Sequence, residues 1–166
     1  MREFYQKLYS QLNEITPLQV DCGELCQSAC CSLEVGEGIY LFPEEECMFT
    51  PQPDWGKIKI SNEMKIIECN GHCRRDERPL FCRIFPLFPY IDHTGEMKII
   101  FYSPMNFICP LIKLGEFEML APDYLEEVAE ISNELAKHPI TRPFLEKISR
   151  EIDEFRKEPW ANLFEK

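Results

Sequence analysis

The chain has 166 residues, of which 45% are hydrophobic and 12% aromatic, and this composition favours one globular domain over a disordered chain. Its formal net charge of −11 argues against nucleic acid and anionic membrane surfaces as partners. The N-terminus has no secretory signal pattern and no stretch approaches about eighteen apolar residues, so we expect a cytoplasmic protein without a membrane span.

The N-terminal part predicts a helix followed by a short strand. Apolar residues recur at helical spacing over residues 2–15, and Pro17 ends the pattern. Residues 38–42 predict a strand. The Pro-Glu-Glu-Glu stretch at 43–46 predicts the first turn of a helix, where proline fits and carboxylates favour the helix dipole.

The middle of the chain predicts two pairs of strands. Residues 57–60 alternate with period two, and residues 64–69 form a second apolar strand after a turn. Residues 87–91 and 97–102 flank Asp-His-Thr-Gly at 92–95, which has the composition of a hairpin turn. These segments predict antiparallel pairing.

The last part of the chain lacks cysteine and predicts two helices. One covers residues 122–136 and the other residues 143–155, with Thr141 as an N-terminal cap. We expect this pair to pack on the cysteine-rich region. The predicted fold is therefore α+β: a single domain of residues 1–166, with a small antiparallel sheet and cysteine-rich loops at 20–110, an N-terminal helix, and a helical part at 117–166.

All nine cysteines fall between residues 22 and 109. Thiolate sulfur is a soft ligand for zinc, copper(I) or iron–sulfur clusters, and closely spaced cysteines can deliver several ligands to one ion. In a reducing cytoplasm, such clusters bind metal more often than they form disulfides, and an odd number of thiols cannot all pair. Adjacent cysteines at 30 and 31 are expected to point in different directions and to serve two centres, or one centre plus a free or redox thiol.

Other residue types near the cysteines fit bound thiolates. His72 lies between Cys69 and Cys73, where it is at most an additional ligand or a hydrogen-bond donor to sulfur. Arginine side chains can stabilise the negative charge of a thiolate site. Four arginines are crowded beside Cys73 and Cys82, namely Arg74, Arg75, Arg78 and Arg83. Solvated pairing with Asp76 and Glu77 is the alternative for the first two.

The arrangement Cys-x3-Cys-x3-Cys-Cys, a strand leading to Glu44, and then Arg-Pro-x-x-Cys-Arg-x-Phe-Pro at 78–86 resembles the YkgJ-like CxxCxxCC family. That family is described as a zinc- or iron-chelating domain. The late Cys109-Pro110 is similar to a Cys-Pro in the related flagellin lysine N-methylases, which are much longer. The first cluster departs from the family in its spacing of three, and Ala29 stands where the family has glycine.

The resemblance and the thiol chemistry together predict a metal-binding protein with one or two centres. The expected ligands are Cys22, Cys26, Cys30, Cys31, Cys69, Cys73, Cys82 and Cys109. Of these, Cys109 is a second-tier candidate, as is Cys47. Zinc is the ion expected to be observed, and the alternative is a [4Fe-4S] cluster acting in redox or methyl-transfer chemistry. A protein partner is compatible with the sequence, which does not itself predict a reaction.

Overall fold

Two hairpins form most of the strand structure, as their alternating apolar residues predict. β2 (Gly56–Ser61) pairs with β3 (Met64–Cys69), and β4 (Leu87–Ile91) pairs with β5 (Met97–Phe101), each in antiparallel register. β1 (Ile39–Tyr40) joins the other edge of β3, so that the larger sheet has the order β1-β3-β2. The structure is a computed structural model that describes residues 1–20, 22–31, 38–71 and 73–159. The fold is α+β, as predicted, and it has two small antiparallel sheets where one was expected.

Gly38 permits the close approach of β1 to β3. A Cβ atom at this position would lie 2.7 Å from the carbonyl oxygen of Ile67, which is closer than a side-chain carbon can approach an oxygen. The apolar residues under this sheet form a small core of their own, made of Leu41, Phe49, Trp55 and Ile67.

The helices surround the two sheets. The long ones are α1 (Arg2–Gln11), α5 (Pro122–Lys137) and α6 (Arg142–Lys157), and the short ones are α2 (Cys22–Cys26), α3 (Leu80–Ile84) and α4 (Pro110–Leu114). Single turns of 3-10 helix are η1 (Ala29–Cys31), η2 (Glu45–Phe49), η3 (Arg75–Glu77), η4 (Ser103–Met105) and η5 (Phe117–Met119). Within the described ranges, no helix combines the length and apolar character needed to cross a membrane.

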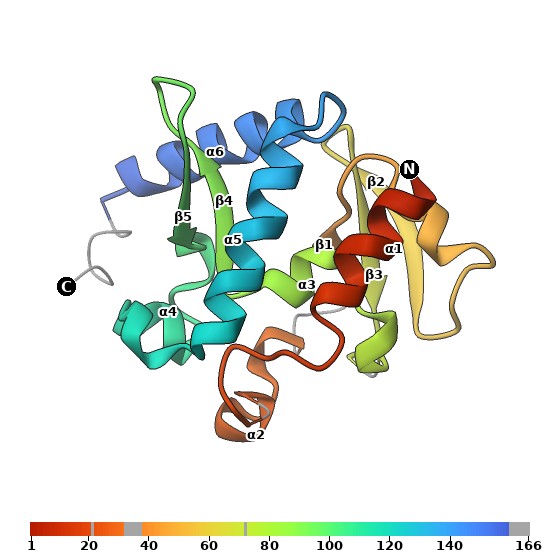
Figure 1. The fold of residues 1–166 in the computed structure, drawn as a ribbon, viewed down its shortest axis with the longest axis horizontal. Coiled ribbons are helices and arrows are strands. Elements are labelled where there is room, and N and C mark those ends of the chain that lie inside the picture. Colours follow the sequence, from red (N-terminus) through yellow and green to blue (C-terminus); the bar gives the residue numbers. More distant parts are fainter. Residues whose placement is uncertain (21, 32–37, 72, 160–166) are drawn as a thin grey trace.

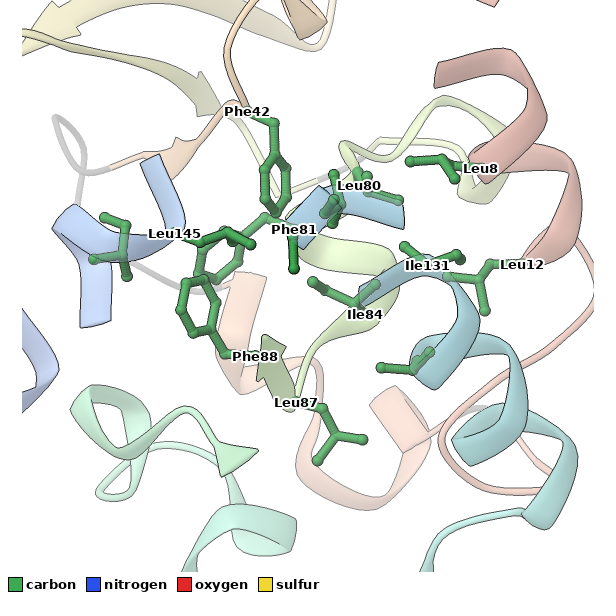
Figure 2. Close-up of a cluster of buried hydrophobic side chains, with 14 of the residues drawn as sticks. Leu8, Leu12, Phe42, Leu80, Phe81, Ile84, Leu87, Phe88, Ile131 and Leu145 are labelled. Carbon is green, nitrogen blue, oxygen red and sulfur yellow. The ribbon is translucent and has the colours of Figure 1, made fainter. Parts of the chain in front are cut away.

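The main core gathers side chains from both ends of the chain. Figure 2 shows Leu8 of α1, Phe81 of α3, Phe88 of β4, Ile131 of α5 and Leu145 of α6 converging on one cluster. All five are fully buried. Burying each such side chain favours folding by about 1.5–3 kcal/mol, so this cluster supplies a large part of the driving force. α3, which carries Cys82, is therefore anchored at the centre of the molecule.

The C-terminal helices pack chiefly on β4 and β5, a hairpin without cysteine that lies inside the 20–110 region on which they were expected to pack (Figure 1). Tyr90 of β4 donates a hydrogen bond to Asp153 of α6 at 2.8 Å, and Ser149 accepts one from the Ile91 amide at 2.8 Å. Thr141 is the N-cap residue of α6, as predicted, but its side chain makes no capping hydrogen bond, because its hydroxyl donates to the Leu135 carbonyl of α5 at 2.5 Å.

α1 is shorter than predicted because its last carbonyls bind elsewhere. The Tyr9 carbonyl accepts hydrogen bonds from the Leu12 amide at 3.2 Å and from Arg83 at 3.3 Å, which closes the helix at Gln11. The predicted helix start at 43–46 is also different. Glu44 adopts a left-handed conformation, and Glu45 begins a 3-10 turn with its side chain completely buried.

Candidate metal centre

All nine cysteines lie in the described ranges, and no disulfide is formed there. The disulfide alternative therefore finds no support. Eight of the thiols, all of them predicted ligands, line two neighbouring pockets, whereas Cys47 lines neither. His72, considered as an extra ligand, lies outside the described residues.

The first thiol pocket, of about 160 Å³, is bordered by five cysteines: Cys30, Cys31, Cys69, Cys73 and Cys82. Cys30 and Cys31 come from η1, Cys69 ends β3, Cys73 precedes η3, and Cys82 lies in α3. Gly71 lets the loop after β3 approach η1, because its φ of 79° is left-handed and a Cβ there would lie 3.0 Å from the Cys31 carbonyl oxygen. The fold thus brings two distant cysteine clusters together.

Cys30 and Cys31 do not diverge as expected. The 3-10 turn holds their sulfur atoms 4.0 Å apart, and both line the first thiol pocket. Cys30 also borders the second pocket, but Cys31 does not. Of the two residues, only Cys30 is therefore placed where it could contact two centres.

The remaining walls of the first thiol pocket are largely aromatic. Tyr40, Trp55, Phe81, Phe85 and Tyr102 line it. Phe81 and Tyr102 pack edge to face with centroids 5.2 Å apart. Sequence reasoning identified the thiols but not these walls, because nothing in an isolated aromatic residue indicates which pocket it borders. An apolar surround lowers the local dielectric and strengthens charge interactions inside the site.

Burial favours the protonated form of two of these thiols, Cys82 and Cys73. Burial, followed by the neighbouring Cys73 and Cys31, raises the pKa of the Cys82 thiol well above its usual range. Burial also raises the pKa of Cys73, partly offset by Arg78. A bound cation would reverse this effect, because coordination stabilises the thiolate.

Among the four nearby arginines, Arg78 is the one that lines the first thiol pocket. Its guanidinium group hydrogen-bonds to Cys73, and its Nε atom is buried without a hydrogen-bond partner among the described residues. Burial alone would lower the pKa of Arg78, but the charges of Cys73 and Cys31 raise it. Arg78 therefore has the position expected of a residue that stabilises bound thiolates.

The other three arginines bind elsewhere. Arg74 forms an exposed ion pair with Asp76, and Arg75 donates to the carbonyl oxygens of Asn13 and Ile15. Arg83 is only 7% exposed and also binds main-chain carbonyls, in contrast to the predicted role beside a thiolate. It donates to Arg78 at 2.8 Å and to Asp76 at 2.7 Å, while its guanidinium carbon lies 4.2 Å from the centre of the Tyr9 ring.

Replacing Arg83 with lysine is expected to destabilise the protein by about 2–3 kcal/mol, because an ammonium group cannot reproduce the planar fork that binds several carbonyls. The effect should appear as a lower midpoint in urea unfolding. Arg74→Lys is the matched control, and its exposed pair with Asp76 predicts no measurable change. Equal midpoints for Arg83→Lys and the wild type would contradict the role assigned to Arg83.

The second thiol pocket, of about 50 Å³, is bordered by the other predicted ligands: Cys22, Cys26 and Cys109, together with Cys30. Cys22 and Cys26 begin and end α2, and Cys109 precedes α4. Figure 1 shows α2 at the periphery of the molecule, beyond the end of α5. The predicted ligands are thus divided between two pockets.

The chemistry of the donors fits a soft metal, but the sulfur atoms are not yet gathered at one point. In the described ranges, no group of three or more His, Cys, Asp or Glu side chains is close enough together to hold an ion. A tetrahedral zinc site with Zn–S bonds of about 2.3 Å needs sulfur atoms about 3.8 Å apart. The 4.0 Å separation of the Cys30 and Cys31 sulfur atoms is near this value. The sulfur atoms of the other cysteines would have to move toward this pair for an ion to bind.

Comparison of the chain with protein-family models, with curated proteins and with solved structures gives no match.

Proposed function

We propose that the protein binds a soft metal through the thiols of the first thiol pocket. The observation that carries this proposal is the convergence of five cysteines, from η1, β3, the loop after it, and α3, on one pocket. Thiolates select zinc, copper(I) and iron–sulfur clusters over hard cations. The cytoplasm, which the sequence predicts as the compartment, would keep these thiols reduced. The family resemblance points to the same chemistry.

Zinc is the first candidate for the bound metal. A closed zinc site of four thiolates would tie η1 to α3 and contribute directly to folding, and it would leave no open position for a reaction. Cys69, Cys73 and Cys82 would hold the ion together with Cys31 or Cys30. Arg78 would offset the net negative charge of such a site through its contact with Cys73.

An iron–sulfur cluster is the second candidate, and the size of the pocket favours it. About 160 Å³ is several times the roughly 30 Å³ that one water molecule takes up in the liquid. The same thiols could then ligate a cluster, and the aromatic walls would limit its contact with solvent. Such a protein would be brown and oxygen-sensitive, whereas the zinc protein would be colourless.

Replacing Cys82 with serine is expected to weaken metal binding by more than about 100-fold. Losing a residue that only hydrogen-bonds to a ligand already weakens metal binding by roughly 10–100-fold, and Cys82 would be a ligand itself. The protein would be purified without oxygen, and its metal content and visible absorption would be measured together. Cys47→Ser is the matched control, because Cys47 is a half-buried thiol outside both pockets. Undiminished metal in Cys82→Ser would overturn the proposal.

A further inference from the structure

The second thiol pocket is lined by thiols and apolar side chains, a combination that favours soft metal ions over hard cations. The residues that line it, apart from its four cysteines, are Leu25, Phe85, Pro86, Pro110 and Leu111. Among these described lining residues, thiols are therefore the only side chains with a donor atom. Apolar walls without a carboxylate or an imidazole disfavour hard cations such as Mg²⁺ and Ca²⁺.

The sulfur atoms in this pocket come from distant parts of the chain. Cys26 and Cys109 are 83 residues apart in sequence (109 − 26), yet the charge of Cys26 acts on Cys109. Tyr124 of α5 is close enough to Cys22 and Cys109 to be influenced by both. Cys22 likewise acts on Cys30. These interactions agree with the placement of the four thiols around one pocket.

Burial raises the pKa of the Cys109 thiol, but two backbone amides beside it favour the thiolate form. The backbone N–H groups of Leu111 and Ile112 donate to its sulfur, an arrangement that stabilises a thiolate ligand. The Cys109 residue is only 8% exposed, so a thiolate there would need a positive counterpart.

The segment that supplies the other thiols consists of short helical turns. α2 has five residues and η1 has three, and neither contains a buried residue. Hydrogen bonds within this segment run from Ser28 to Gly23, from Cys31 to Ser28 and from Cys26 to Cys22. A helix of one turn is not stable by itself in water. An ion bound to its cysteines and to Cys109 would tie this segment to the start of α4.

We infer that the protein has a second metal centre, in which Cys22, Cys26 and Cys109 bind a soft metal ion and Cys30 lies between this centre and the first thiol pocket. The inference rests on the proposed function, because both centres depend on thiolate chemistry. It goes beyond that function in assigning two metal equivalents to the chain and in dividing the ligands between them.

Titration of the reduced, metal-free protein with Zn²⁺ and with Co²⁺ tests the inference. The wild type should bind two equivalents, and the Co²⁺ thiolate charge-transfer absorption should rise until two are bound. Cys109→Ser should bind one equivalent, as should Cys82→Ser. The double variant should bind neither tightly, and Cys47→Ser should still bind two. Binding of two equivalents by Cys109→Ser would overturn the second centre, as would binding of a single equivalent by the wild type.

The failure of this inference is distinguishable from the failure of the proposed function. If Cys82→Ser loses metal while Cys109→Ser loses none, the second centre is wrong and the proposed function stands. If neither variant loses metal, both are wrong. Because Cys109 is buried and its replacement could impair folding, Cys26→Ser provides a second variant at a half-buried position, and it should show the same loss of one equivalent. Full retention of metal by a folded Cys26→Ser would likewise overturn the inference.

Discussion

Glu45→Ala is expected to destabilise the protein by about 3–5 kcal/mol, since it leaves several buried donors without an acceptor. The Glu45 carboxylate is completely buried and joins three parts of the fold. It accepts the Leu80 amide of α3 at 2.6 Å, the Phe42 amide at 2.8 Å and the hydroxyl of Tyr9. Urea unfolding monitored by circular dichroism measures the effect.

Glu46→Ala is the matched control for this change. Glu46 is the next residue in the same 3-10 turn, but it pairs with Lys65 near the surface. Such partly exposed pairs contribute about 0–1 kcal/mol, so the control should remain close to the wild type. Similar losses of stability in the two variants would show that the turn, and not the buried acceptor, matters.

The Glu45 carboxyl should also make stability depend on pH. Burial raises its pKa from 4.5 to about 7, in spite of the hydrogen bonds from Leu80 and Tyr9 and the nearby positive charge of Arg83. Because the folded pKa is the higher one, the stabilisation is full below pH 4.5 and is lost as the pH rises through 7. The stability difference between wild type and Glu45→Gln should therefore fall by about 2.5 kcal/mol from about pH 5 to about pH 8.

The burial of Glu45 shows what the sequence could not predict. In the run Glu44-Glu45-Glu46, nothing local distinguishes the residue that is buried from its neighbours. Its environment is created by Tyr9 of α1 and by the first amide of α3, which are 36 and 35 residues away. A helix start was the reasonable local interpretation, and tertiary contacts override it.

Strands and long helices were predictable because their signals are local. The alternation at Lys57–Ile60 and the turn composition at Asp92–Gly95 specify the hairpins without reference to the rest of the chain.

The role of Arg83 could not be predicted from its position in the sequence. Its neighbour Cys82 lines the first thiol pocket, whereas the guanidinium group of Arg83 binds main-chain carbonyls. Sequence spacing identified the thiols, but only the fold separates Cys47 from the others and places Cys30 between two pockets.

Removal of metal with a chelator is expected to release the segment of residues 22–31 before the rest of the protein. This segment has no buried residue, whereas α1, α3, β4, α5 and α6 share the main core and should stay folded at 25 °C. If bound metal contributes even about 5 kcal/mol, its loss should lower the melting temperature by about 10–20 °C. Adding zinc back should restore the original value.

Proteolysis at Glu24 measures this release at one site. Glu24 is an exposed residue of α2, and a protease specific for glutamate should cut there at least about tenfold faster after chelation, because cleavage requires local unfolding. Glu96, in the exposed turn between β4 and β5, is the internal control, because that hairpin contains no cysteine and none of its residues lines either thiol pocket. Its cleavage rate should remain constant. Equal rates at Glu24 with and without chelator in a metal-loaded sample would mean that metal does not hold α2 in place.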